Sequence, residues 1–134
     1  MNIAIVHDDL MRMGGAERVC LYFHNAFPDA KIFTLAYREN KTYPEFKECL
    51  IETSWYSHFV KNENQMKRFF FPFGLFAMQK LDLTQYDVVL MSTTYCAKYV
   101  KTSKDALVVC YCYTPFRLAW RPNSYELYEK SKGI

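Results

Sequence analysis

The stretch NIAIVHDDLMRMGGAERVCLYFHNAFPDAKIFTLA, residues 2–36, decides the fold of this chain. Residues 2–6 are a short apolar, β-branched burst, as expected for a strand buried on both faces of a parallel sheet. From Gly15 apolar residues recur at three- and four-residue spacing, which predicts an amphipathic helix that ends at Pro28. A second burst at residues 31–36 predicts another strand. The stretch is therefore one βαβ unit, whose first loop is expected at the carboxyl edge of the sheet, where open α/β folds bind ligands.

The rest of the chain extends this sheet. Residues 87–91 and 106–111 predict two further strands, parallel to the first two. Residues 40–64 are expected to be irregular and could include one short strand. Residues 65–80 look helical at both ends, with a break at an internal proline and glycine, and residues 123–131 predict a last helix. The expected fold class is α/β, with a Rossmann-like parallel sheet flanked by helices in one domain, residues 1–134.

Composition excludes several functional classes. The chain has 134 residues, 51% of them apolar, which is enough for one globular core. Its net charge of +3 is scattered over Lys and Arg with no run longer than a pair, so nucleic acid is not an expected partner. The amino terminus lacks a signal peptide core, and no run approaches the roughly 20 apolar residues of a membrane span. We therefore expect a cytoplasmic protein, at most peripheral to the inner face of the membrane.

The five cysteines form no CxxC pair and no cluster with histidine at metal-ligand spacing. They predict reduced, mostly buried thiols. No metal site and no cofactor are expected.

Gly14 and Gly15 separate the first strand from the first helix. A backbone without Cβ atoms there lets a phosphate approach the NH groups at the amino end of the helix, or simply forms a tight turn. The chain has neither G-x-G-x-x-G nor GK[ST], so the dinucleotide fingerprint and the P-loop are both absent. The local pattern leaves both interpretations open.

Four segments together resemble the amino-terminal domain of family 4 glycosyltransferases of the GT-B fold, especially bacterial enzymes of surface-polysaccharide assembly. They occur in the family's order and cover nearly the whole chain. GGAERV after a first strand and YxxTPFRxAW late in the domain are the most specific parts. The segments are IAIVHDDLMRMGGAERV (3–19), DAKIFTLAY (29–37), LDLTQYDVVLMSTTYCAK (81–98) and CYCYTPFRLAW (110–120).

The resemblance implies two Rossmann-like domains that face each other across a cleft. The second domain, of which this chain contains nothing, would hold most of the nucleotide-sugar donor, and this domain would hold the acceptor. Gly14 and Gly15 would approach the donor diphosphate, and the sugar would be transferred with retention and without an essential metal. Candidate acceptor or sugar contacts are His7, Asp9, Glu17, Tyr113 and Arg117.

Several of these candidates have alternative interpretations. Glu17 could instead complement the helix dipole, and Arg117 could either clamp a phosphate or hold its loop by a salt bridge. Asp9 replaces the aromatic residue of the HDWL sequence that close relatives carry. Tyr113 replaces the histidine of YCHTP, and a tyrosine does not act as an acid or base near neutral pH without a large pKa shift.

The segment from Phe69 to Met78 is rich in phenylalanine and is flanked by Lys67, Arg68 and Lys80. An apolar wedge with a basic rim suits contact with a membrane surface and a lipid-linked acceptor. A helix buried over the sheet would have the same composition.

Three functions are consistent with these features. The leading hypothesis is the acceptor-side domain of a retaining glycosyltransferase that moves a sugar from a nucleotide-sugar to a saccharide or lipid-linked acceptor in surface polysaccharide synthesis. The alternative is a non-catalytic binding or membrane-associated scaffold of the same fold, which Tyr113 favours. A nucleotide-binding oxidoreductase is disfavoured because the glycine loop lacks the dinucleotide spacing.

Overall fold

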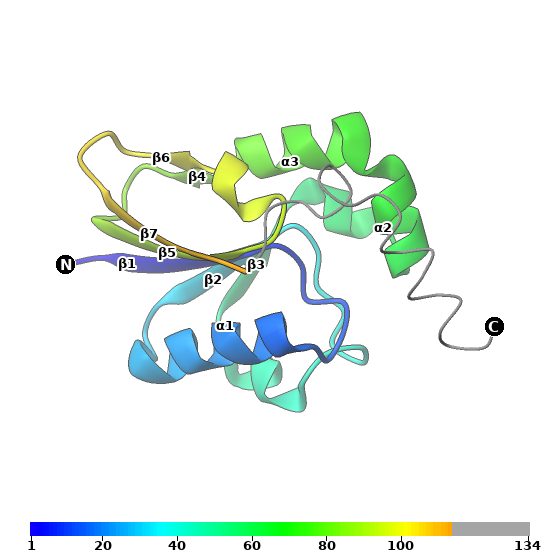
Figure 1. Cartoon of the computed structure of the whole chain (residues 1–134), viewed down its shortest axis with the longest axis horizontal. Coiled ribbons are helices and arrows are strands. Elements are labelled where there is room, and N and C mark those ends of the chain that lie inside the picture. Colours follow the sequence, from blue (N-terminus) through cyan, green and yellow to red (C-terminus); the bar gives the residue numbers. More distant parts are fainter. Residues whose placement is uncertain (114–134) are drawn as a thin grey trace.

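The computed structural model describes residues 1–113, which form an α/β fold around a five-stranded parallel sheet (Figure 1). The strand order is β3-β2-β1-β5-β7, and each neighbouring pair is parallel. Helix α1 covers one face of the sheet, and α2 and α3 lie on the other. The strands of this sheet are β1 (Ile3–His7), β2 (Lys31–Thr34), β3 (Ile51–Thr53), β5 (Val88–Thr93) and β7 (Leu107–Cys112).

The remaining elements connect these strands. A small parallel pair, β4 with β6, forms a second sheet. Short helical turns follow β2, β3 and β5. The remaining elements, in chain order, are α1 (Gly15–Ala26), η1 (Pro44–Glu48), η2 (Trp55–His58), α2 (Glu63–Phe69), η3 (Phe70–Gly74), α3 (Leu75–Lys80), β4 (Asp82–Leu83), η4 (Ala97–Tyr99) and β6 (Lys101–Thr102).

The main elements predicted from the sequence are confirmed. The strands expected at residues 2–6, 31–36, 87–91 and 106–111 correspond to β1, β2, β5 and β7, and all pair in parallel. The short strand in the irregular region is β3. The β4–β6 pair and η4 were not predicted. The helix expected at residues 123–131 lies outside the described residues.

The break expected between residues 65 and 80 is also present. Phe71 has an extended backbone, with φ −99° and ψ 127°, between the helical residues on either side. The ring of Pro72 disfavours a helical conformation at the residue before it, which explains why the break falls at Phe71. The segment therefore consists of two short helices, α2 and α3, joined through η3.

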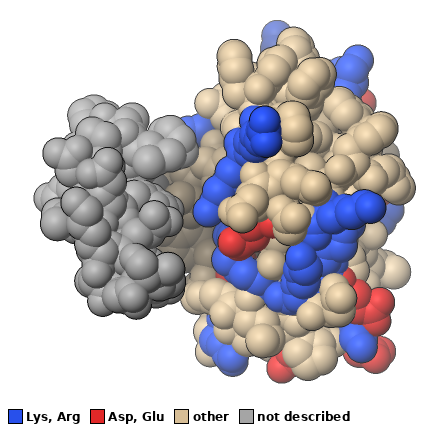
Figure 2. All heavy atoms as spheres, turned by 90° about the vertical axis from the view of Figure 1, so that its right-hand side faces the viewer, with Lys and Arg blue, Asp and Glu red and all other residues tan. Residues whose placement is uncertain are grey.

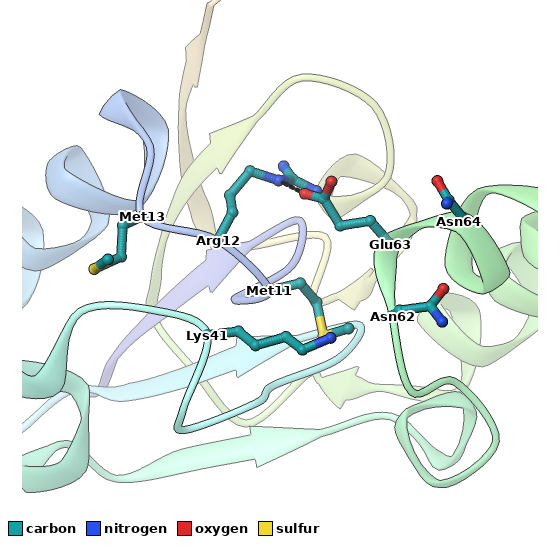
Figure 3. A pocket seen from close by; sticks show the side chains of 7 residues that line it. All are labelled: Met11, Arg12, Met13, Lys41, Asn62, Glu63 and Asn64. Carbon is teal, nitrogen blue, oxygen red and sulfur yellow. Dashed lines mark hydrogen bonds and ion pairs between the residues drawn. The ribbon is translucent and has the colours of Figure 1, made fainter.

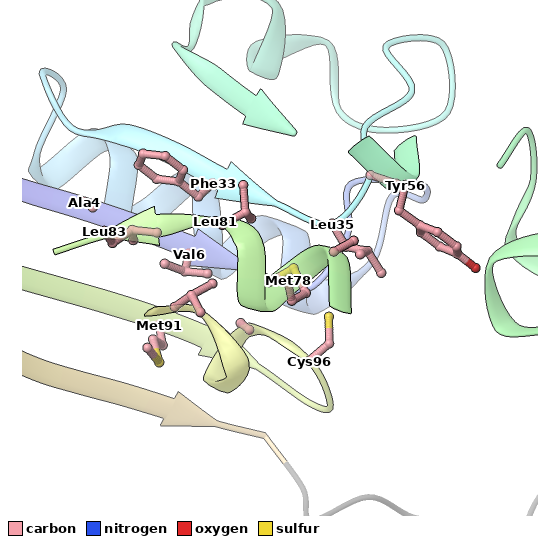
Figure 4. Packing of buried hydrophobic residues seen from close by; sticks show 14 of the residues in the cluster. Ala4, Val6, Phe33, Leu35, Tyr56, Met78, Leu81, Leu83, Met91 and Cys96 are labelled. Carbon is pink, nitrogen blue, oxygen red and sulfur yellow. The ribbon is translucent and has the colours of Figure 1, made fainter. Parts of the chain in front are cut away.

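The core lies in two layers because side chains of a strand alternate between its faces. Ala4 and Val6 of β1 pack with Met78 of α3 on one side of the sheet (Figure 4). Ile5 packs on the other side, with Cys20 of α1. The sheet is thus buried on both faces at its centre, as the apolar character of β1 predicted.

The prediction of mostly buried cysteines was wrong for part of the set. All five thiols are free, and Cys20 and Cys96 are buried, but Cys49 is half-buried. Cys110 and Cys112 are exposed because β7 is the edge strand of the sheet. An apolar sequence predicted the strand correctly but not its position at the edge.

The strand order places a topological switch point between β1 and β5. From β1 the chain adds β2 and β3 on one side, and later adds β5 and β7 on the other. Ligands of open α/β sheets bind outside the carboxyl ends of the strands at such a point. The last residue of β1, His7, is in register with Ser92 of β5, so these two residues mark the expected site.

Among the helices of residues 1–113, none has both the length and the apolar character needed to cross a membrane.

Candidate functional site

Three side chains meet at the switch point because they share one face of the sheet. His7 lies two residues after Ile5, and Ser92 lies two residues after Leu90. Both of these earlier residues pack in the core layer under α1. Tyr113 likewise follows Tyr111, whose ring lies 6.5 Å from that of Phe23 in α1. Strand alternation therefore directs all three toward the amino end of α1.

These side chains form a hydrogen-bonded chain. The Tyr113 hydroxyl lies 2.7 Å from Ser92 Oγ, and Ser92 Oγ lies 2.9 Å from His7 Nδ1. His7 Nδ1 also lies 3.1 Å from the carbonyl oxygen of Ser92. The Tyr113 hydroxyl donates in addition to the carbonyl of Ala16 in the first turn of α1, at 3.3 Å. Burial raises the pKa of Tyr113, so its hydroxyl stays protonated near neutral pH.

Glu17 connects this chain to the glycine loop. Its Oε2 accepts a hydrogen bond from the backbone NH of Gly14 at 2.9 Å, and its Oε1 lies 3.6 Å from both His7 Nε2 and Arg12 Nη1. Burial alone would raise the pKa of Glu17, but the hydrogen bond and charge of His7 and the charge of Arg12 outweigh it and lower this pKa. Glu17 is therefore a buried anion that caps α1 and orients His7.

The neighbouring Asp8 points to the opposite face of the sheet and has a structural role. Its carbonyl oxygen and carboxylate fix the turn between β5 and η4. The carboxylate accepts five hydrogen bonds, from Thr93 Oγ1 (2.8 Å) and from the backbone NH groups of Thr94, Tyr95 (3.1 Å), Cys96 (2.9 Å) and Ala97 (2.8 Å).

Asp9 is fully buried, and Arg12 holds it in place. Arg12 Nη2 donates to Asp9 Oδ1 at 2.9 Å, and the hydroxyl of Tyr95 donates to Asp9 Oδ2 at 2.7 Å. Burial raises the pKa of Asp9, although Arg12 and Tyr95 oppose this effect. Burial lowers the pKa of Arg12, but the negative charges of Asp9 and Glu63 outweigh this effect. The net pKa of Arg12 is raised above its ordinary value, so Arg12 remains charged.

An open depression of about 480 Å³ lies beside this cluster. Figure 3 shows Arg12 and Glu63 pointing toward each other across it, between the loop that follows β1 and the start of α2. Lysine and arginine side chains gather around a small acidic area on this edge of the molecule (Figure 2). The lining residues are Met11, Arg12, Met13, Lys41, Asn62, Glu63 and Asn64.

The two glycines of the loop differ in their surroundings. A Cβ at Gly14 would lie 2.5 Å from Glu17 Oε2, whereas a Cβ at Gly15 would meet no atom within 4 Å. Since Glu17 occupies the NH of Gly14, the amides that remain for an anion are those of Gly15 and Ala16, the first residues of α1. The open side of the loop is therefore at Gly15.

The structure brings most of the predicted site residues together. His7, Glu17 and Tyr113 belong to one network, and Asp9 joins it through Arg12. Arg117 lies outside the described residues.

Sequence reasoning missed Ser92, Arg12 and Tyr95, and assigned no role to Asp8. The polar run after the apolar strand of residues 87–91 was a signal for Ser92, because polar residues at the carboxyl end of a parallel strand face the site. Glu63 had no such signal, because it reaches Arg12 from a position 51 residues away in the sequence.

Within residues 1–113, no three His, Cys, Asp or Glu side chains are arranged to hold a metal ion. No known protein family, curated protein or solved structure matches the chain.

Proposed function

We propose that this chain is the acceptor-side domain, the amino-terminal half of a GT-B fold, of a retaining glycosyltransferase that uses a nucleotide-sugar donor in surface polysaccharide synthesis. The observation that carries the proposal is the open polar depression lined in part by the loop after β1, just before the free amino end of α1. In open α/β sheets ligands bind at the loops that follow the carboxyl ends of the strands. The resemblance of the glycine loop and of the YCYTP strand end to family 4 glycosyltransferases supplies the reaction class.

The lining of the depression suits a saccharide. Asn62 and Asn64 offer amide donors and acceptors, and Glu63 offers a carboxylate. Lys41 adds a cationic donor, and Arg12, which is paired with Asp9 and Glu63, adds positive charge. Hydroxyl groups of a sugar need this mixture of donors and acceptors, so we assign the acceptor to the depression.

The donor diphosphate would lie at Gly15. The first amides of a helix and the positive end of its dipole attract phosphate, and no side chain occupies the space over Gly15. Glu17 lies next to this position as an anion, but its carboxylate is turned inward to Gly14, His7 and Arg12. In this proposal His7, Ser92 and Tyr113 position the end of the cleft where the two substrates meet.

Gly15→Val in the full-length protein tests the donor assignment. We expect transfer to fall roughly a hundred- to a thousand-fold, because a branched side chain would exclude the diphosphate from the amides. The melting temperature should stay close to that of the parent, since the space over Gly15 is open. The measurement is transfer of labelled sugar from a panel of nucleotide-sugars to a bacterial lipid extract, with Leu50→Val, an exposed position away from the glycine loop, as control.

Unchanged transfer in Gly15→Val would remove this glycine from the site. Calorimetry on residues 1–134 gives a second test. The domain alone should bind nucleotide-sugar weakly, because the missing domain would hold the base and ribose. Micromolar binding of the donor to this chain would contradict the assignment as an acceptor-side half.

A non-catalytic binding domain of the same fold is the second candidate, and Tyr113 favours it. The hydroxyl of Tyr113 is engaged by Ser92 and Ala16, and its raised pKa removes acid–base chemistry near neutral pH. If the full-length protein binds a saccharide but transfers no sugar from any nucleotide-sugar of the panel, this second function replaces the first.

A further inference from the structure

The segment from α2 to α3 exposes four phenylalanine rings on the surface. We call them the aromatic ridge. They come from the end of α2, from the break at η3 and from α3. Their exposed fractions are 47% for Phe69, 76% for Phe71, 52% for Phe73 and 56% for Phe76.

The ridge is not part of the hydrophobic core. The inner side of the same segment fills that role with Met66, Ala77 and Met78, all almost fully buried. Phe70 also turns inward, and its ring lies 5.2 Å from that of Tyr95. The sequence predicted membrane contact for the whole segment from Phe69 to Met78, but Met78 belongs to the core. The outward rings are apolar area beyond what the fold requires.

The rim of the ridge is basic. Lys67, Arg68 and Lys80 are exposed, and residues 64–81 contain no acidic residue. No ion pair among residues 1–113 involves any of these three cations. The guanidinium of Arg68 lies 5.6 Å from the centre of the Phe69 ring, so charge and aromatic surface are adjacent. The surface thus combines apolar rings with positive charge that has no protein counter-ion there.

We propose that the aromatic ridge docks this protein on an anionic membrane surface. Phenylalanine side chains enter the boundary between headgroups and acyl chains, and lysine and arginine beside them attract anionic lipids. The break at Phe71 interrupts the helix, and the Phe71 ring is the most exposed of the four, so it can enter a headgroup layer without a complementary pocket. The positive rim selects an anionic bilayer over a neutral apolar protein surface as the occupant.

The ridge lies close to the depression, so docking of the ridge would also bring the depression to the membrane surface. Helix α2 begins at Glu63, in the lining of the depression, and ends at Phe69 in the ridge. Seven helical residues span about 10 Å, so a docked ridge would hold the depression close to the headgroups. If the proposed function holds, this geometry makes a lipid-linked saccharide the acceptor class. The docking itself does not depend on that function.

Co-sedimentation with vesicles tests the proposal. The probes are vesicles of pure phosphatidylcholine and vesicles with about 30% phosphatidylglycerol, with the whole chain and no nucleotide-sugar present. We expect binding to the anionic vesicles alone at physiological salt. Phe71→Ser combined with Phe73→Ser should lower the partition coefficient at least tenfold. Lys67→Glu combined with Arg68→Glu should lower it at least 25-fold, at about fivefold for each cation lost, because the two added carboxylates also repel the anionic lipid.

Matched controls separate the ridge from a general effect of the substitutions. Tyr22→Ser changes an exposed ring of α1, on the opposite face of the sheet, and Lys104→Glu changes an exposed cation beyond β6. Both should leave the partition coefficient within twofold of the parent. All variants should keep the parent's melting temperature within a few degrees, because the ridge residues are exposed.

Three results would overturn the docking proposal: equal binding to neutral and anionic vesicles, an equal loss in the Tyr22 or Lys104 variants, or no binding. A parent protein that is dimeric by light scattering and becomes monomeric on Phe71→Ser would instead identify a second copy of the chain as the occupant. Vesicle binding needs no donor, so its failure leaves the proposed sugar transfer intact. Vesicle binding by this chain together with no transfer by the full-length protein would in turn refute the function and keep the docking.

Discussion

Replacing Asp8 by alanine should strongly destabilise the protein. The Asp8 carboxylate accepts hydrogen bonds from the buried backbone NH groups of Cys96 and Ala97, from the half-buried NH groups of Thr94 and Tyr95, and from the hydroxyl of Thr93. A buried NH that loses a charged acceptor costs about 2 kcal/mol, so two such groups give about 4 kcal/mol. Alanine offers no acceptor to these two buried NH groups.

Urea unfolding followed by circular dichroism measures this loss. We expect Asp8→Ala to lower the free energy of unfolding by about 4 kcal/mol and Asp8→Asn by about half as much, because asparagine keeps one carbonyl oxygen toward the turn. If the alanine variant does not fold, the asparagine variant still gives a measurable value. A loss below about 1 kcal/mol in both variants would refute the role of Asp8 as the anchor of this turn.

Three further predictions concern the glycine loop and the thiols. Gly14→Ala should lower the free energy of unfolding by about 1 kcal/mol, because its Cβ would displace the capping carboxylate of Glu17, while Gly15→Ala should be neutral or slightly stabilising. A larger loss at Gly15 than at Gly14 in urea unfolding would show that Gly15, and not Gly14, is the crowded position of the loop. The folded-state pKa of Glu17 lies below its ordinary value of 4.5, so the parent should be more stable than Glu17→Gln by its full margin above pH 4.5. This margin should shrink as the pH falls through the folded-state pKa. A margin that grows on acidification in thermal melts would show the opposite pKa shift. Iodoacetamide should label Cys110 in the native protein and leave Cys96 unlabelled until urea is added, since Cys96 is buried and its thiol pKa is strongly raised; peptide mass spectrometry with early labelling of Cys96 would contradict the packing.

The parallel sheet could be predicted because each of its central strands is apolar on both faces. The pattern of α1 was equally readable, from Gly15 to the proline after it. The β4–β6 pair could not be predicted, since two-residue strands such as Asp82–Leu83 carry no periodicity and form only because the flanking elements bring them together.

The site was predictable where it depends on strand ends and not where it depends on tertiary contacts. His7 and Tyr113 follow apolar strands directly, so their place at the carboxyl edge could be inferred from the sequence. The role of Asp8 was hidden, because nothing in the sequence tells which of the two neighbouring acids accepts the NH groups of the turn after β5. The ion pair of Arg12 with Glu63 depends on how α2 packs against the loop after β1, which no local pattern encodes.

The hydrogen-bonded chain at the switch point has a polarity that limits what Tyr113 can offer a ligand. A carbonyl oxygen only accepts, so the single hydroxyl proton of Tyr113 is directed to Ala16, and the hydroxyl of Ser92 must donate to Tyr113. His7 then supplies the Nδ1 proton at the other end, toward Ser92. Tyr113 consequently presents a lone pair and no proton to the cleft. A group that binds there must bring its own hydrogen, which admits an alcohol or an ammonium group and repels a phosphate oxygen.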